Sequence, residues 1–220
     1  MTAMHPMTPR PKRLLLLSLL PNAWVETAGG RGERSLYLSF DDGPHPTHTG
    51  PLLDLLATHG VLATFFLVGE QVERHPELAR RIVDAGHTLG NHSYSHPVFD
   101  SLSLRRQIDE IDRTDALLGA IDGRPVHPFR PPRGVLPPAM MVHFLRQRRR
   151  IAYWSYDSLD YSRRPAHELI ELAQRHPPRA GDIILMHDDS AISMQVLERM
   201  IPQWKREGFR FDALRSEAIR

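Results

Sequence analysis

The residues best suited to chemistry are two adjacent carboxylates, Asp41 and Asp42, at the end of a short apolar segment. Leu36, Leu38 and Phe40 alternate with smaller or more polar residues, which predicts a β-strand, and the Gly-Pro that follows the acids predicts its end. Neighbouring side chains at a strand end point in different directions, and two adjacent carboxylates repel unless a cation neutralises one. The pair therefore indicates a metal ligand beside a base, although Asp, Gly and Pro are also typical of a solvated turn.

His92 and His96 lie four residues apart, so one helical turn or a tight loop would place both imidazoles on the same side. Such a pair alone is as typical of capping or surface histidines as of a metal site. With Asp42 the set becomes two nitrogens and one carboxylate. Three protein ligands leave a metal position open for water and substrate, which is typical of a catalytic rather than a structural site.

Composition limits the class of protein. The chain has 220 residues, of which 41% are hydrophobic, and this suits a single domain with one substantial core. It contains 13 histidines and no cysteine, so any metal must be held by His, Asp or Glu. The formal charge is only +2, although the pI is about 9.2, so charge gives no reason to expect nucleic acid as a partner.

The N-terminal segment, residues 1–34, is predicted to be an extension ahead of a domain at 35–220. Basic residues 10–13 precede the apolar run 14–20, which resembles a weak secretory signal, but Pro21 ends the run early and no clear cleavage site follows. The run is too short to span a membrane. We expect a cytoplasmic location slightly more than the cell envelope or periplasm, which would apply if the segment is a signal. Residues 27–33, rich in glycine, are predicted to be a linker.

The rest of the chain alternates predicted strands and helices. The expected strands are 36–40, 61–68, 87–90, 151–156, 182–186 and 209–211. The expected helices are 50–59, 76–85, a long one from an N-cap at Ser103 to Leu118, 138–147, 165–175 and 193–206. Pro202 is expected to kink the last helix or end it early.

Repeated strand–helix units with apolar strands favour a parallel sheet. Polar clusters occur where strands end, and in a β/α barrel those ends share one face, on which active sites are built. Five clusters fit: 41–42, 92–96, 130–134, 157–161 and 185–188. Their convergence predicts a functional site.

These clusters, in this order, resemble the five motifs of the NodB-homology polysaccharide deacetylases. The matching residues are Phe40-Asp41-Asp42-Gly43-Pro44, Asn91-His92-Ser93-Tyr94-Ser95-His96, Arg130-Pro131-Pro132-Arg133-Gly134, Asp157-Ser158-Leu159-Asp160-Tyr161 and Ile184-Leu185-Met186-His187-Asp188. The resemblance implies a single-domain α/β fold, a distorted (β/α) barrel of about seven parallel strands. It also implies a metal-dependent hydrolase that removes acetyl groups from N-acetylated amino sugars of a poly- or oligosaccharide.

By the same resemblance Asp41 is the base, His187 the acid, and the metal ligands are Asp42, His92 and His96. Zinc is expected, with cobalt, nickel or manganese as alternatives. Arg130 would keep Asp41 ionised. Because Pro131 and Pro132 have no N–H, the first backbone donor of that loop is at Arg133, a candidate for contacting the oxyanion.

The remaining assignments concern the acid and the substrate. Asp160 is expected to orient His187, with Asp157 as the alternative. Leu185 is expected either to line an acetyl pocket or simply to belong to the core. The family usually has an aromatic residue and a tryptophan where this chain has Arg133 and Tyr161, so both are candidate substrate contacts, and Arg133 favours an anionic glycan.

The arginines at 146, 148, 149 and 150 are interpreted as a solvated helix end, with an anionic-ligand patch as the alternative. Two other functions stay open. One is a hydrolase of sugar O-acetyl esters or non-sugar amides on the same barrel, and the other is a catalytically silent barrel that binds glycan or metal. The presence of base, ligands and acid together disfavours the silent barrel.

Overall fold

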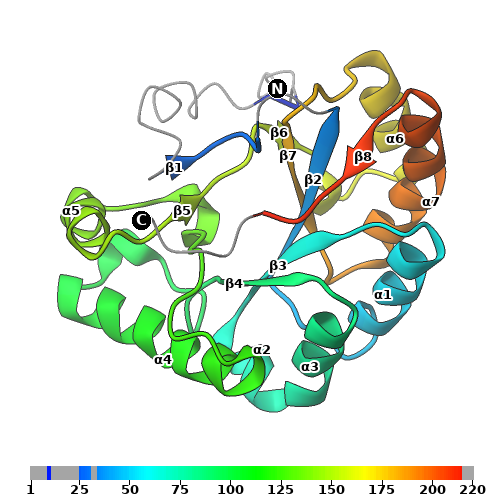
Figure 1. Cartoon of the computed structure of the whole chain (residues 1–220). Coiled ribbons are helices and arrows are strands. Elements are labelled where there is room, and N and C mark those ends of the chain that lie inside the picture. The colour runs from blue at the N-terminus through cyan, green and yellow to red at the C-terminus, as the bar shows by residue number, and fades with distance from the viewer. Residues whose placement is uncertain (1–8, 11–24, 31–33, 215–220) are drawn as a thin grey trace.

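The computed structural model describes residues 9–10, 25–30 and 34–214, and these form an α/β fold around a central parallel sheet (Figure 1). The strands are β1 Val25–Glu26, β2 Ser35–Asp41, β3 Ala63–Leu67, β4 Thr88–Asn91, β5 Ile151–Ala152, β6 Tyr156–Asp157, β7 Ile183–His187 and β8 Arg210–Phe211. The α-helices are α1 Thr49–Thr58, α2 Gly69–Arg74, α3 Pro76–Asp84, α4 Leu104–Asp122, α5 Pro138–Gln147, α6 Ala166–Arg175 and α7 Ala191–Arg206. Short 3₁₀ helices are Phe99–Ser101, Pro132–Gly134 and Asp160–Ser162.

β2 lies at the centre of the main sheet, whose order is β4-β3-β2-β7-β6, with β8 beside the start of β2. Every pairing is parallel. Parallel strands that follow helices all end on the same edge, so the last residues of β2, β4 and β7 come together. The register places Asp41 directly beside His187.

The segment around Phe129 lies between the end of β4 and the start of β5. Phe129 forms isolated parallel bridges with Asn91 on one side and Ile151 on the other. The chain then runs from β5 to β6, which pairs with β7. The strands are therefore arranged as an open, distorted barrel, since β5 and β6 are joined by the chain and not by strand pairing. This irregular region carries Arg130.

The helices form an outer layer in which neighbours contact in the order α6, α7, α1, α3, α4, α5 (Figure 1). The main core lies between them and the sheet. All five residues of β3 are buried, as the apolar run at 61–68 predicts for a strand covered on both faces. Gly90 leaves room for the ring of Phe66, because a Cβ there would lie 2.4 Å from a ring atom.

The class of fold agrees with the expectation from sequence, and several details differ. The expected strand at 151–156 is two short strands, and α2 has no counterpart in the prediction. Ser103 is the N-cap of α4, as predicted, but the helix continues beyond Leu118 to Asp122 and ends at Gly123 with a φ of 79°. The last helix reaches its predicted end at Arg206, so Pro202 does not end it early, and a kink at Pro202 stays a prediction.

The described parts of the N-terminal segment lie on the domain. β1 pairs with β5, and Val25 is completely buried. The backbone oxygen of Pro9 accepts a hydrogen bond of 2.7 Å from the Asp157 N–H. The signal-like run at 14–20 lies outside the described residues, and the division at residue 35 stays a prediction. Among the residues described, no helix has the length and apolar character needed to cross a membrane.

Candidate active site

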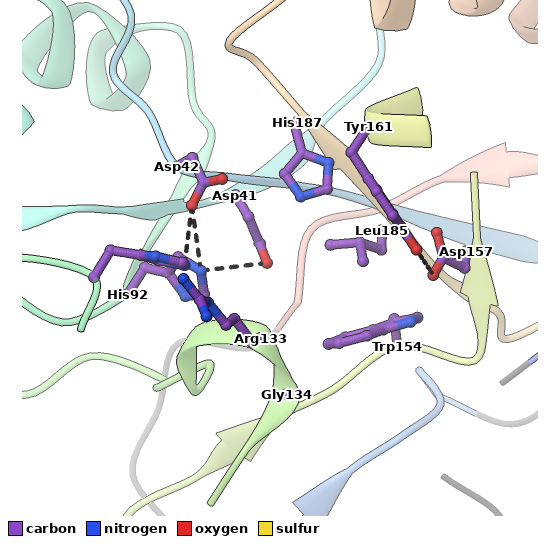
Figure 2. A pocket seen from close by; sticks show the side chains of 11 residues that line it. Asp41, Asp42, His92, Arg133, Gly134, Trp154, Asp157, Tyr161, Leu185 and His187 are labelled. Carbon is purple, nitrogen blue, oxygen red and sulfur yellow. Dashed lines mark hydrogen bonds and ion pairs between the residues drawn. The ribbon is translucent and has the colours of Figure 1, made fainter. Parts of the chain in front are cut away.

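A cavity of about 330 Å³ opens at the edge where β2, β4, β6 and β7 end (Figure 2). It brings together side chains from all five predicted clusters. The lining residues are Asp41, Asp42, His92, His96, Arg133, Gly134, Trp154, Asp157, Tyr161, Leu185 and His187. Arg130 and Asp160, the other two predicted site residues, lie behind this wall and bond to members of it.

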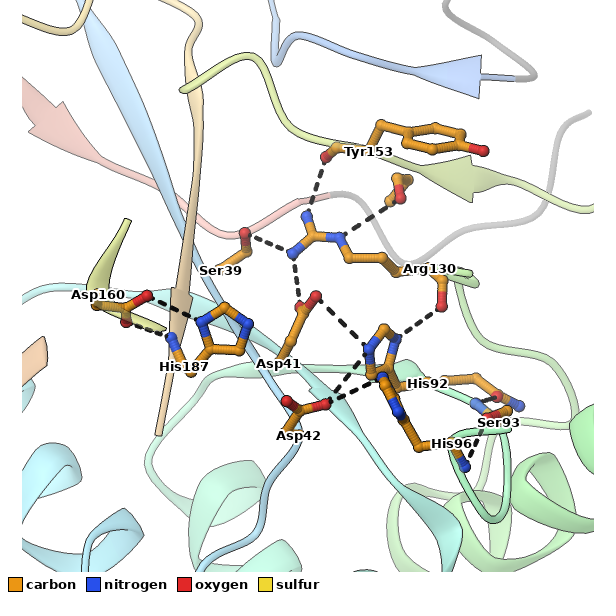
Figure 3. A network of polar contacts seen from close by, with 12 residues as sticks. Ser39, Asp41, Asp42, His92, Ser93, His96, Arg130, Tyr153, Asp160 and His187 are labelled. Carbon is orange, nitrogen blue, oxygen red and sulfur yellow. Dashed lines mark hydrogen bonds and ion pairs between the residues drawn. The ribbon is translucent and has the colours of Figure 1, made fainter. Parts of the chain in front are cut away.

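Asp42, His92 and His96 form a compact donor group on one side of the cavity (Figure 3). Oδ1 of Asp42 lies 3.5 Å from Nε2 of His92 and 3.5 Å from Nε2 of His96. Two ligands about 2.1 Å from one ion, at a tetrahedral angle, lie roughly 3.4 Å apart. The spacing of these donors therefore fits a divalent ion.

The protonation of His92 fits the same conclusion. Its Nδ1 lies 2.7 Å from the backbone oxygen of Arg130. A carbonyl oxygen only accepts hydrogen bonds, so Nδ1 carries the proton and the Nε2 lone pair is left for a metal. Burial lowers the pKa of His92 to about 3, which keeps the ring neutral.

Asp41 is held by a completely buried arginine (Figure 3). Nη1 of Arg130 donates to Oδ1 of Asp41 at 2.7 Å and to the hydroxyl of Ser39 at 2.9 Å, and Nη2 donates to the carbonyl of Tyr153 at 2.9 Å. The guanidinium also stacks on Phe66, 4.0 Å from the ring centre. Burial raises the pKa of Asp41, and the charge and hydrogen bond of Arg130 oppose that rise. One carboxylate oxygen of Asp41 is thus bonded to Arg130, and the other is left to face the cavity.

His187 is oriented by Asp160. Oδ1 of Asp160 lies 2.9 Å from Nδ1 of His187, and Oδ2 accepts from the His187 backbone N–H at 2.7 Å. The Ser193 hydroxyl lies 2.5 Å from the same Oδ2. Burial acts to lower the pKa of His187, but the bond to Asp160 and nearby carboxylates, including Asp41, raise it to about 10. Nδ1 is fixed against Asp160, so Nε2 is the nitrogen left to face the cavity.

Asp157, the alternative orienting acid, contacts other groups. Its Oδ1 accepts from the Leu159 N–H at 2.9 Å, and its Oδ2 accepts from the Tyr161 hydroxyl at 3.0 Å. This bond holds Tyr161 against His187 in an edge-on contact, with ring centres 5.4 Å apart. Asp157 therefore positions a cavity wall rather than the imidazole.

Leu185 and Trp154 form the apolar part of the cavity, and Arg133 lies near its rim (Figure 2). Leu185 is almost fully buried, while Arg133 is exposed. Sequence reasoning did not identify Trp154, which lies within the predicted strand 151–156 but outside the five clusters. Its position near the end of a strand was the available signal.

One sequence interpretation is wrong. Arg149 is not part of a solvated helix end, because it is only 5% exposed. Its two terminal nitrogens donate to the carboxylate of Asp115 at 2.6 and 3.0 Å. The spacing of an arginine run says nothing about which member turns inward.

Comparison with known proteins finds relatives that share a family name. The sequence model described as polysaccharide deacetylase matches residues 28–144, a little over half of the chain. A Bacillus cereus protein named peptidoglycan-N-acetylglucosamine deacetylase is 33% identical over 210 residues, covering 90% of this chain and 75% of the relative. A chitooligosaccharide deacetylase of Rhizobium leguminosarum bv. trifolii is 38% identical over 162 residues, covering 72% and 74%.

Among solved structures, a peptidoglycan N-acetylglucosamine deacetylase in complex with 4-naphthalen-1-yl-N-oxidanyl-benzamide superposes with a TM-score of 0.83. It shares 30% sequence identity, and the match covers 90% of this chain and 95% of that one. The chain belongs to the polysaccharide deacetylase family, the NodB-homology group of carbohydrate esterases.

Proposed function

We propose that this protein is a metal-dependent hydrolase that removes acetyl groups from N-acetylated amino sugars of a glycan. The observation that carries the proposal is the cavity itself. Asp41 and His187 are register neighbours at the ends of β2 and β7, and the three-residue donor group stands beside them. Family membership supports the class of reaction, and the geometry supports the residue roles proposed below.

Asp42, His92 and His96 would hold the ion, for which zinc is our proposal because two imidazoles and one carboxylate suit it. Such an ion supplies Lewis acidity, which lowers the pKa of a water molecule and polarises a carbonyl. Cobalt, nickel or manganese would accept the same donor set.

The chain's own residues would carry the proton transfers. Asp41 accepts the proton of the attacking water through the carboxylate that Arg130 holds in place. His187 donates a proton to the amine as its bond to the acetyl carbon breaks, and the acetyl group leaves as acetate. Leu185 and Trp154 line the cavity next to these groups and would contact the acetyl methyl. The Arg133 N–H is the proposed backbone donor to the oxyanion.

Arg133 and Tyr161 would contact the sugar. The exposed guanidinium of Arg133 at the cavity rim offers paired donors suited to a carboxylate or phosphate. The preferred glycan should therefore carry negative charge near the acetylamino group.

Acetate release from a substrate panel tests both parts of the proposal. The panel contains neutral chito-oligosaccharides, peptidoglycan fragments bearing carboxylates, and O-acetylated sugars. Release from the N-acetyl substrates is expected, and Arg133→Tyr should weaken use of the anionic substrate and improve use of the neutral one. Release from O-acetyl sugars alone would contradict N-deacetylation. Equal kinetics of the parent and Arg133→Tyr on both N-acetyl substrates would remove only the anionic preference.

A further inference from the structure

The loop that carries both metal-binding histidines has a backbone that needs support. Ser93 has a φ of 66° and His96 a φ of 52°, in the left-handed region that residues other than glycine rarely adopt. This conformation turns His96 back toward His92, so that both Nε2 atoms reach Oδ1 of Asp42 (Figure 3). The geometry of the donor group therefore depends on what holds this loop.

Three of the five backbone N–H groups of residues 92–96 donate to the neighbouring strand β3 or to side chains at the start of the loop. The His92 N–H donates to the Leu67 carbonyl at 3.0 Å. The Ser93 N–H donates to Oδ1 of Asn91 at 2.9 Å, and the His96 N–H donates to the Ser93 hydroxyl at 3.2 Å. In the middle of the loop, the carbonyls of Ser93 and Tyr94 accept hydrogen bonds of 2.9 Å each from the N–H groups of Gly69 and Glu70 in α2. The two remaining N–H groups, those of Tyr94 and Ser95, have their partner on another helix.

Glu110, on α4, holds that middle section. Its Oε2 accepts from the N–H of Tyr94 at 3.0 Å and from the N–H of Ser95 at 2.7 Å. Its Oε1 accepts from the Ser95 hydroxyl at 2.9 Å. A single side chain thus accepts hydrogen bonds from three donors between the two histidines.

The same helix also holds the start of the loop. The side-chain nitrogen of Asn91 donates to the Ile111 carbonyl at 2.9 Å and to Asp115 at 2.8 Å. Asn91 is buried, and Glu110 is only partly covered. α4 therefore holds the loop by two contacts, a buried one to Asn91 and a more exposed one through Glu110.

We propose that Glu110 is a positioning residue for the metal centre, one that acts through the backbone of Tyr94 and Ser95 to set the separation of His92 and His96. This inference rests on the proposed metal-dependent function. Glu110 lies in a separate surface hollow on α4, not in the active-site cavity. Its effect is on the geometry of the ligands, and partners of this kind typically change metal affinity by about 10-fold to 100-fold.

Asp109 provides a matched control. It is an exposed acid on the same helix, lines the same hollow and carries the same charge. Asp109→Ala removes that charge without touching the hydrogen bonds to the loop, whereas Glu110→Ala removes both. Glu110→Gln keeps an acceptor for the two N–H groups without the charge. The three variants separate loop support from long-range attraction of a cation.

The experiment measures zinc affinity of the metal-free full chain by competition with a coloured chelator, together with the melting temperature of each metal-free variant. Glu110→Ala is expected to bind zinc at least about 10-fold more weakly than the parent. Glu110→Gln should stay within about threefold of the parent, and so should Asp109→Ala. Melting temperatures of all three should lie within about 4 °C of the parent value.

Four results would overturn the inference. Parental zinc affinity in Glu110→Ala would show that the loop holds its geometry without the carboxylate. An equal loss in Asp109→Ala, or no recovery in Glu110→Gln, would assign the effect to charge. A fall of more than about 4 °C in the melting temperature of Glu110→Ala would make Glu110 a general structural contact. Absence of zinc binding in the parent would instead contradict the proposed metal centre itself.

Discussion

The adjacent acids Asp41 and Asp42, where β2 ends, contact different partners. Asp41 is buried and bonded to Arg130 at 2.7 Å, whereas Asp42 has a φ of 75° and turns its carboxylate toward His92 and His96. Neighbouring side chains at a strand end point in different directions, and the left-handed φ of Asp42 sets the direction of the second carboxylate.

Asp41→Asn should retain the metal and lose most turnover. The amide keeps the shape and can still accept a bond from Arg130, but it does not take a proton from water, which is worth roughly 100-fold to 10,000-fold in kcat. Asp42→Asn is the matched variant and should lose bound metal. Metal content by elemental analysis and kcat by acetate release check both. Loss of metal in Asp41→Asn with retention in Asp42→Asn would show that the two roles are exchanged.

His187 is linked to one of two nearby acids. Asp160 bonds to both its ring and its backbone N–H, whereas Asp157 bonds to Leu159 and Tyr161. The sequence left the choice open because both acids follow the same predicted strand. The directions of the two carboxylates depend on the left-handed φ of 60° at Leu159. No sequence pattern predicts that backbone conformation.

Asp160→Asn should lower kcat by roughly 100-fold or more, because the imidazole loses both its orientation and the carboxylate that favours its charged form. Asp157→Asn should act mainly on KM, since it loosens Tyr161 at the cavity wall. Steady-state kinetics of the two variants make the comparison. A larger fall in kcat for Asp157→Asn than for Asp160→Asn would contradict the assigned orienting acid.

At the scale of elements, a buried polar network joins α4 and the residues after α5 to Asn91, which precedes the loop of His92 and His96. Asp115 accepts from Arg149 and Asn91, and Nδ1 of His127 lies 3.1 Å from the same carboxylate. These groups come from α4, the end of β4, the segment before Phe129 and the residues after α5. The network thus connects the irregular side of the barrel to the site.

Arg149→Met should destabilise the protein by about 3 kcal/mol, because a buried carboxylate loses its cation while Asn91 and His127 still contact it. Arg146→Met, at an exposed position of α5, should change stability by less than about 0.5 kcal/mol. Urea denaturation of the metal-free proteins measures both. Equal stability of the two variants would show that the buried pair contributes little.

Element types and order followed from periodicity, capping and turn residues, as α5 at 138–147 and the Ser103 cap illustrate. Periodicity does not register an element as short as α2, which has six residues. Nor does it show that Arg149 turns inward, since burial of an arginine depends on an acid from a distant helix. These differences arise from tertiary contacts that local patterns do not encode.

At the scale of the whole molecule, the parallel arrangement explains why motifs far apart in sequence meet. Four of the five clusters lie at the ends of predicted strands, which was sufficient to predict their convergence on one edge of the sheet. The cluster at 130–134 follows no predicted strand, because Phe129 before it forms only isolated bridges, yet the cavity includes residues from each cluster. Trp154 was not foreseen, because its place depends on the irregular passage between β5 and β6. A regular barrel pattern does not describe that passage.

The central claim is that turnover depends on an ion held by Asp42, His92 and His96. The most direct measurement is acetate release from an N-acetylglucosamine oligomer or peptidoglycan fragment, compared for the untreated protein, a chelated sample shown by elemental analysis to be metal-free, and that sample after addition of zinc. Activity should disappear on removal of the metal and return with about one zinc per chain, the stoichiometry of a single catalytic site. Undiminished acetate release from the verified metal-free protein would contradict the account.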